Sequence, residues 1–191
     1  MPRSHRPPLR WWPRTKAQAV LAQSARLQLT AMRPDDALAY ADSLSDPDVR
    51  EWQGYDDEVV NRNVRHFVPS LSIQFRGLPT QLAVRDAETG TWLGYYGLTQ
   101  DSMDLLGDTV FLGWWLADAA RGRGLGHESL QLVLRWLHDE AMVGTVRMGT
   151  RSDNVRALAM ITRTGARLQD EHPTLLPNGT APLGKWFVHE L

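Results

Sequence analysis

The segment Arg121-Gly-Arg-Gly-Leu-Gly126 has the residue types that a phosphate-binding turn needs. Its three glycines let the backbone turn tightly and let a ligand approach without a Cβ atom in the way. The segment lies between a predicted strand and a predicted helix, whose free first-turn amides and dipole favour a phosphate or pyrophosphate. Arg121 and Arg123 would add positive charge. The alternative is a turn that only connects the strand to the helix.

Two other kinds of phosphate-binding turn do not fit this segment. A P-loop needs Lys followed by Ser or Thr after its last glycine, whereas Gly126 is followed by His127 and Glu128. A dinucleotide-binding turn would need a glycine in place of His127 and an acidic residue that closes a βαβ unit. The sequence therefore excludes both of these nucleotide-binding classes.

The chain has 191 residues and a formal net charge of −1, which fits one globular domain with its own core. It contains no cysteine, which excludes disulfides, thiolate metal sites, iron–sulfur clusters and a cysteine nucleophile, and we predict no metal site. No apolar run reaches the length of about 18 residues that spans a bilayer. The patch Ala17–Ala22 is interrupted and too short for a secretory signal, so we expect a soluble cytoplasmic protein.

Positive charge is concentrated near the N-terminus. Seven of the 21 basic residues precede the first acidic residue, Asp35, which leaves 14 bases against 22 acids and a formal charge of −8. The segment Met1–Lys16 also contains four prolines and the pair Trp11–Trp12. We therefore expect residues 1–24 to form an irregular basic arm before a domain of residues 25–191. We favour an arm that folds back on the acidic body over one that binds nucleic acid or a membrane surface.

Hydrophobic periodicity and turn residues predict an α/β (α+β) domain. The three strands between residues 80 and 116 should form an antiparallel meander because short turns connect them. The expected order is β-α-α-β-β-β-α-β-α-β-β. The predicted strands are 26–32, 80–85, 92–99, 109–116, 145–149, 166–171 and 185–190, and the predicted helices are 35–45, 58–75 with a break at Pro69, 125–142 and 153–164.

The glycine-rich segment resembles the acyl-CoA signature of the GNAT acetyltransferase superfamily, Arg/Gln-x-x-Gly-x-Gly/Ala. Glu128 behind it and the strand end Leu112-Gly-Trp-Trp-Leu-Ala117 are similar to the ribosomal-protein N-acetyltransferase (RimJ/RimL-like) branch. Asn154 and Gly165 resemble a second motif of that branch at a compatible spacing. The resemblance covers about residues 26–191 in element order. It implies a GNAT-like central sheet, mixed and mostly antiparallel, and acetyl-CoA as co-substrate.

The resemblance also implies roles for particular residues. Backbone amides of the glycine-rich turn and the helix start would hold the pyrophosphate of CoA. Leu116 and Ala117 would pair with pantetheine as a neighbouring strand does, and Asn154 would bind pantetheine unless it only caps its helix. Alternation along the strand puts one of Trp114 and Trp115 in the core and the other toward the acceptor cleft. The residues implied for CoA binding are Leu116, Ala117, Arg121, Gly122, Arg123, Gly124, Leu125, Gly126, His127 and Asn154.

The proton-transfer residues common in this superfamily are missing. The position of the fourth-strand glutamate is Phe111, that of the frequent tyrosine is Ile161, and that of the branch's serine is Ala157. Attack of an amine on a thioester needs a deprotonated amine and a protonated or stabilised thiolate. Asp170 and Glu171, near the end of a late strand, are the nearest analogues of the carboxylate base of the branch, and we predict them as catalytic.

Other candidates for the reaction lie in or near the predicted helices. His66, Glu51 and Asp56 belong to the region that normally builds the acceptor site. Ser152 would reach the thiolate, although a helix cap explains it better. Catalysis can also proceed by positioning alone, with ordered water carrying the proton.

The sequence therefore predicts an acetyl-CoA-dependent N-acetyltransferase in which a primary amine attacks directly in a ternary complex, since no cysteine can form a covalent intermediate. The acceptor would be a protein N-terminus or a small amine, and the acidic remainder of the chain favours a cationic one. The resemblance is compatible with a homodimer. The alternatives are a non-catalytic acyl-CoA-binding regulatory protein and a nucleic-acid-associated protein that acts through the basic arm.

Overall fold

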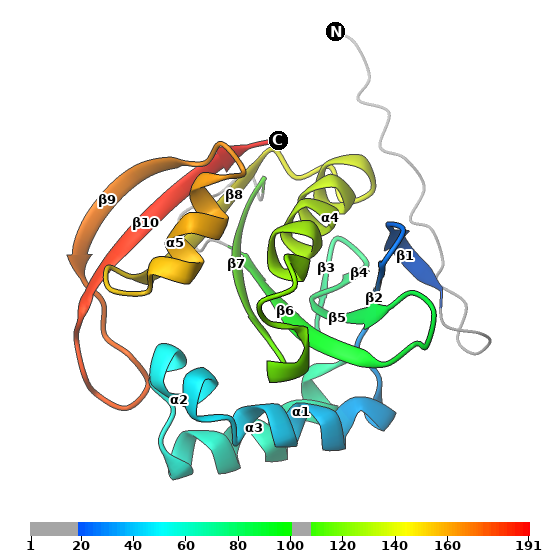
Figure 1. Ribbon diagram of the computed structural model, residues 1–191, viewed down its shortest axis with the longest axis horizontal. Coiled ribbons are helices and arrows are strands. Elements are labelled where there is room, and N and C mark those ends of the chain that lie inside the picture. Colours follow the sequence, from blue (N-terminus) through cyan, green and yellow to red (C-terminus); the bar gives the residue numbers. More distant parts are fainter. Residues whose placement is uncertain (1–18, 101–107) are drawn as a thin grey trace, which may run out of the picture.

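One large, mostly antiparallel sheet forms the centre of the molecule (Figure 1). The computed structural model describes residues 19–100 and 108–191, and within these ranges eight strands join in the order β1-β2-β5-β6-β7-β8-β10-β9. Neighbouring strands are antiparallel except β7 and β8, which are parallel. The strands are β1 (Val20–Gln23), β2 (Leu27–Ala31), β5 (Gln81–Asp86), β6 (Trp92–Gln100), β7 (Thr109–Leu116), β8 (Thr145–Arg151), β9 (Arg167–Pro173) and β10 (Leu183–Glu190), and β3 (Gln74–Phe75) pairs with β4 (Leu78–Pro79) in a separate hairpin.

Helices cover both faces of this sheet. In Figure 1, α1, α2 and α3 form one group at the bottom, whereas α4 and α5 lie side by side in front of the strands. No helix within the described ranges is long and apolar enough to cross a membrane. The helices are α1 (Ala37–Leu44), α2 (Pro47–Gln53), α3 (Asp57–Ser70), α4 (Leu125–Asp139) and α5 (Val155–Thr162), with short 3-10 turns at Pro34–Asp36 and Asp118–Ala120.

Two hydrophobic cores follow from the alternation of side chains along the strands. On β5, Leu82 and Val84 belong to the core beneath α4 and α5, while Ala83 belongs to the core beneath α1 and α3. On β7, Trp115 is 8% exposed and lies in the second core, stacked on Tyr95 with ring centroids 4.3 Å apart. Both faces of the central strands are thus buried, which explains their nearly continuous apolar sequence.

The predicted order of elements is confirmed, and the structure adds α2 between the first two predicted helices. Asp46 caps this helix by accepting hydrogen bonds from the amides of Asp48 (2.8 Å) and Val49 (3.3 Å), and Pro47 occupies its first turn. Gly54 ends it with φ of +65°. With seven residues, α2 is too short for a full hydrophobic repeat, so periodicity does not reveal it.

The structure also adds β1, which lies within the segment 1–24 that was expected to be irregular. Val20, Ala22 and Gln23 pair with β2, and the amide of Ser24 donates to the carbonyl of Leu27 (2.8 Å). The sheet therefore begins before Arg26. The predicted basic segment Met1–Lys16 lies outside the described residues.

A buried ion pair fixes the junction between β2 and α1. The Nη2 atom of Arg85 lies 2.6 and 2.7 Å from the two carboxylate oxygens of Asp36, and the two side chains are 6% and 5% exposed. Arg85 Nε also donates to Thr30 Oγ1 (3.2 Å), and the amide of Arg33 donates to Asp36 (2.8 Å). These bonds satisfy both charges inside the protein, so the pair tolerates burial.

Replacing Asp36 should strongly destabilise the protein. Asp36→Ala leaves the Arg85 guanidinium buried without its anion, and we expect a loss of about 3–5 kcal/mol in the free energy of unfolding. Urea unfolding followed by tryptophan fluorescence measures this loss. The exposed neighbour Asp35 provides the control, Asp35→Ala. A difference between the two variants below about 1 kcal/mol would contradict the role of the pair.

Candidate active site

The parallel pair in the sheet is incomplete. Strands β7 and β8 pair only over Thr109–Leu112 and Thr145–Met148. Beyond these four pairs, β7 continues beside β6 and β8 continues beside β10, so the two strands separate. We call the opening between Gly113–Leu116 and Gly149–Arg151 the fork. Backbone groups at a fork lack a neighbouring strand and must find other partners.

Side chains supply partners for two carbonyls of β7 at the fork. The carbonyl of Trp114 accepts from Gln53 Nε2 (3.2 Å), which comes from the end of α2. The carbonyl of Leu116 accepts from Nε (3.1 Å) and Nη2 (3.0 Å) of Arg121. The fork is thus held open by polar side chains.

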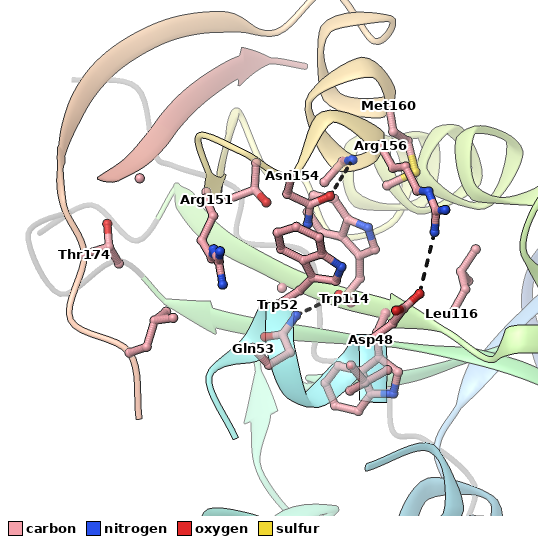
Figure 2. Close-up of a pocket in the computed structure, with 18 of the residues that line it drawn as sticks. Asp48, Trp52, Gln53, Trp114, Leu116, Arg151, Asn154, Arg156, Met160 and Thr174 are labelled. Carbon is pink, nitrogen blue, oxygen red and sulfur yellow. Dashed lines mark hydrogen bonds and ion pairs between the residues drawn. The ribbon is translucent and has the colours of Figure 1, made fainter. Parts of the chain in front are cut away.

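A cavity of about 320 Å³ occupies the fork (Figure 2). In Figure 2, Trp52 and Gln53 approach it from α2, and Asn154 and Met160 approach it from α5 on the opposite side. Thr174, in the connection between β9 and β10, lies at its far end. One cavity therefore reaches both helix groups through the sheet.

The glycine-rich turn lies at the α5 end of this cavity. Gly122 and Gly124 have φ of +71° and +74°, and a Cβ atom on either would meet no atom within 4 Å. The space beside the turn is therefore open to a ligand. Gly126 differs, because a Cβ there would lie 3.0 Å from Met160 Sδ. This glycine allows α4 to pack closely on α5.

The backbone amides of the turn are unpaired. Helix α4 begins at Leu125, and no amide from Gly122 to His127 donates a hydrogen bond to a described residue. Gly122, Gly124, Gly126 and His127 line a second cavity together with Arg156 of α5 and Arg163, the residue that follows α5. Unpaired amides at a helix N-terminus with two guanidinium groups nearby form a site for phosphates. Sequence reasoning missed the two arginines, although their seven-residue separation, about two helical turns, indicates one face of a helix.

Glu128 ties the turn to the start of the sheet. Its carboxylate accepts from Ser24 Oγ (2.6 Å) and from Arg26 Nε (2.8 Å) and Nη2. Arg26 also donates to the carbonyl of Arg123 (3.3 Å) in the turn itself. Partial burial acts to raise the pKa of Glu128, but these hydrogen bonds and the Arg26 charge hold the pKa below its ordinary value. The carboxylate therefore stays ionised and keeps the turn in place at neutral pH.

The sequence matches the Acetyltransferase (GNAT) domain family over residues 26–167. This chain belongs to the GNAT acetyltransferase family. It is an acetyl-CoA-dependent N-acetyltransferase, and the resemblance of its sequence to the GNAT superfamily is confirmed.

Solved GNAT structures share the fold of this acetyltransferase. A GNAT-family acetyltransferase from Bacillus anthracis has a TM-score of 0.71 at 14% identity, covering 88% of this chain and 97% of that chain. RimL, the ribosomal L7/L12 α-N-protein acetyltransferase, in complex with coenzyme A has a TM-score of 0.71 at 15% identity. This match covers 90% of this chain and 98% of the RimL chain. The aminoglycoside acetyltransferase AAC(6′)-Ib in complex with coenzyme A has a TM-score of 0.67 at 18% identity. This match covers 86% of this chain and 94% of that chain.

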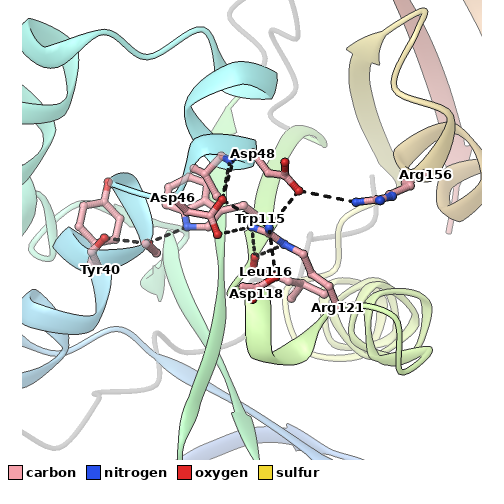
Figure 3. A network of polar contacts seen from close by, with 10 residues as sticks. Tyr40, Asp46, Asp48, Trp115, Leu116, Asp118, Arg121 and Arg156 are labelled. Atoms are coloured by element: carbon pink, nitrogen blue, oxygen red, sulfur yellow. Dashed lines mark hydrogen bonds and ion pairs between the residues drawn. The ribbon is translucent and has the colours of Figure 1, made fainter.

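Arg121 makes contacts that the sequence did not predict. Its guanidinium contacts Asp46 (2.9 and 3.3 Å) and Asp48 (3.1 Å) of the α2 region besides Leu116 (Figure 3). Through these contacts, the Arg121 guanidinium connects the glycine-rich turn to α2. Arg123, the other arginine of the turn, is exposed and donates to the carbonyl of Ala119 (3.4 Å). Arg121, Arg156 and Arg163 all line the second cavity beside the open glycines.

Backbone groups that were predicted to pair with pantetheine already form hydrogen bonds inside the protein. Ala117 donates its amide to Leu93 (2.9 Å) and accepts from the amide of Ala120 (2.9 Å), so neither backbone group is free to pair with a ligand. The carbonyl of Leu116 is likewise engaged by Arg121. Asn154 caps α5 by accepting from the amide of Ala157 (3.1 Å), yet it also lines the cavity. Both of the roles considered for Asn154 are therefore compatible with its position.

The three positions without proton-transfer residues have distinct surroundings. Phe111 lines the cavity, with its ring centroid 5.4 Å from that of Trp186. Ala157 also lines the cavity, whereas Ile161 is fully buried in the core. None of the four tyrosines lines the cavity as the described residues define it. Trp114 and Trp115 both line the cavity; Trp115 is 8% exposed in the second core, whereas Trp114 stacks on Tyr96 with ring centroids 6.0 Å apart.

Asp170 and Glu171 do not reach the cavity. They lie on β9, the outermost strand, where both side chains are exposed. Glu171 pairs with Lys185 (3.2 Å), and the Asp170 carboxylate lies 4.0 Å from His172 Nε2. The sequence predicts these carboxylates near the end of a late strand, which is β9 in the structure. However, β10 lies between β9 and β8, the strand that borders the fork.

The remaining candidates also lie outside the cavity lining. Glu51 and His66 are exposed on α2 and α3, and Asp56 caps α3 by accepting from the amide of Val59 (2.9 Å). Ser152 does not cap α5, because Asn154 does. Sequence reasoning missed Trp52 and Gln53, which lie in the helix that periodicity did not reveal.

Substitution of Gly124 tests the phosphate-binding turn. In Gly124→Val the side chain enters the open space beside the turn, and we expect the Kd for CoA, measured by calorimetry, to rise at least about tenfold, or 1.4 kcal/mol. Gly90 is the matched control because its φ is +71° and its surroundings are equally open. Gly90→Val carries the same backbone strain away from the turn and should bind CoA as the unmodified protein does. Equal affinities of the two variants would show that the turn does not hold CoA.

Proposed function

We propose that this acetyltransferase transfers an acetyl group from acetyl-CoA to a primary amine by direct attack inside the fork. The supporting observation is the single cavity that is lined by α5, next to the phosphate site, and by α2 on the other side of the sheet. Donor and acceptor can enter such a cavity from opposite ends and meet where β7 and β8 separate. Holding two reactants in this way accounts for a large part of the rate enhancement of enzymes.

Residues in two regions of this chain are suited to bind CoA. When bound, acetyl-CoA supplies an acetyl group activated as a thioester. The amides from Gly122 to His127, with Arg156 and Arg163, would hold its phosphates. Asn154 Nδ2 makes no hydrogen bond to a described residue and lies at the cavity, so it would donate to the pantetheine.

The cavity offers no free carboxylate as a general base. Among the described residues that line it, Asp48 is the single carboxylate, and it pairs with Arg121 (3.1 Å) and Arg156 (3.6 Å). We therefore propose that the amine attacks as its free base and that solvent, rather than a side chain, exchanges the protons. Positioning and exclusion of competing water would then account for catalysis.

The pH dependence tests this mechanism. Below the pKa of the amine, kcat/KM should rise about tenfold per pH unit, because the free-base fraction of the acceptor rises by that factor. A β,β-difluoro analogue is less basic than its parent amine at similar shape, so its profile should shift to lower pH by the difference in amine pKa. A profile with the same midpoint for both acceptors would instead indicate an ionising group of the enzyme.

Charge removal on β9 provides a second test. Because Asp170 and Glu171 lie outside the cavity lining, Asp170→Asn and Glu171→Gln should each keep kcat within about twofold of the unmodified enzyme. Removal of a general base lowers rates by about 10²–10⁴-fold. A loss of that size would restore these carboxylates as the catalytic residues that the sequence predicts.

An acceptor screen with thiol release as the readout tests the proposed function itself. RimL acts on a ribosomal protein and AAC(6′)-Ib on aminoglycosides, so peptide N-termini, aminoglycosides and simple amines all belong in the screen. Release of CoA that requires an amine, with the acetylated amine identified by mass spectrometry, would support acetyl transfer. Binding of acetyl-CoA without turnover of any amine would favour an acyl-CoA-binding regulatory protein.

A further inference from the structure

Aromatic side chains line the part of the cavity that faces α2. We call this part the acceptor half and define it by Trp52, Phe111, Arg151, Leu176 and Trp186. It lies across the fork from α5, which carries the residues proposed for CoA. An acceptor class assigned to this half rests on the proposed function, in which the amine occupies it.

The sheet side of the acceptor half is a row of adjacent rings, of which His172 and Trp186 are stacked and Phe111 is tilted. The centroid of Phe111 lies 5.4 Å from that of Trp186, and His172 stacks on Trp186 at 5.5 Å with an interplanar angle of 16°. A Cβ atom on Gly149 would lie 2.4 Å from the Trp186 ring, so this glycine lets the indole lie flat across β8. The row presents an extended apolar surface to the cavity through Phe111 and Trp186.

Trp52 forms the opposite wall and already carries a cation. The guanidinium carbon of Arg151 lies 4.8 Å from the Trp52 ring centroid. Arg151 is fixed there by Asp153, through Nε (2.9 Å) and Nη2 (2.5 Å). The cation–π site on this face of Trp52 is thus occupied by the protein, and an ammonium group would meet a positive charge beside it.

The acceptor half contains no anionic partner for a charged ligand. The single lining carboxylate among the described residues, Asp48, is shared between Arg121 (3.1 Å) and Arg156 (3.6 Å). A polycation would lose hydration at several ammonium groups without gaining a carboxylate, whereas an apolar body gains from burial against the rings. Acidic groups that make the remainder of the chain negative, such as Glu51 and Asp170, lie outside the cavity.

We propose that the acceptor is a small monoamine whose amino group is carried on an aromatic body, and that polycations are poor acceptors. The ring of such an amine would lie between Trp52 and the row formed by Phe111 and Trp186, with the amino group toward the fork. The whole cavity measures about 320 Å³, which suits a compact molecule better than a multi-ring aminoglycoside. The acceptor is thus selected by its aromatic body and not by the positive charge that net charge alone favours.

The experiment compares acceptors on the full-length enzyme, with kcat/KM expressed per free-base amine because the four amines differ in basicity. At saturating acetyl-CoA, kcat/KM is measured by thiol release for 2-phenylethylamine, propylamine, spermidine and kanamycin. Calorimetry measures binding of the same amines to the CoA complex, so selectivity has a readout that does not require turnover. We expect 2-phenylethylamine to exceed each of the other three at least about tenfold in both measurements, since an aromatic ring buries more apolar surface.

Variants of Trp52 test whether this side chain causes the preference for an aromatic amine. Trp52→Ala should reduce the ratio of 2-phenylethylamine to propylamine about tenfold, and Trp52→Phe should restore most of it. Leu175→Ala is the control, because Leu175 is 75% exposed and lies next to Leu176 but outside the cavity lining. This control should keep the ratio of the unmodified enzyme.

The outcomes separate the acceptor class from the proposed function. Spermidine or kanamycin acting as well as 2-phenylethylamine, or an unchanged ratio in Trp52→Ala, would overturn the aromatic acceptor while acetyl transfer stands. Selective binding of 2-phenylethylamine without acetylation of any amine would support the aromatic site and refute the proposed function. Equal or undetectable binding of all four amines to the CoA complex would also overturn the aromatic acceptor.

Discussion

The rest of the site depends on the early end of hydrogen bonding between β7 and β8. Two parallel strands in the middle of a sheet would normally continue to pair, and separating them exposes backbone groups that need partners. Here Gln53 and Arg121 supply those partners to two carbonyls of β7. The opening is therefore a stable part of the folded sheet, and it gives both faces access to one cavity.

The donor and acceptor sides are joined by charge more than by apolar packing. Asp46 caps α2 and also pairs with Arg121, and Asp48 connects Arg121 with Arg156 on α5. Each carboxylate thus serves the helix that carries it and a neighbouring element. Because Arg121 also contacts the end of β7, a single guanidinium relates the positions of the glycine-rich turn, the fork and α2.

Local sequence predicted the elements around the glycine-rich turn well. The glycine-rich turn, the start of α4 and the strand before it are encoded by adjacent residues, so their spacing is readable without the fold. Positive φ at Gly122 and Gly124 fits the interpretation drawn from the sequence. The ion pairs of Arg121 were not predicted because its partners, Asp46 and Asp48, lie more than 70 residues earlier, and only the folded chain brings them together.

The acceptor side was harder to predict for physical reasons. It is assembled from α2, β8, β10 and the connection after β9, and no short segment contains more than a part of it. Trp52 and Trp186 are 134 positions apart in the sequence. Asp170 and Glu171 were expected nearby by analogy with the carboxylate base of the RimJ/RimL-like branch, but the order of β10 and β9 in the sheet moves them one strand farther out.

The short length of α2 has a consequence for how such an enzyme diversifies. Its first turn, with Asp46 and Asp48, is committed to the framework through Arg121 and Arg156, whereas its last turn presents Trp52 to the cavity. This seven-residue helix thus stabilises the framework at its first turn and lines the cavity at its last turn. Exchange of the last turn can alter the cavity wall while the first turn preserves the scaffold, so acceptor preference can drift among descendants of one fold without loss of the donor site.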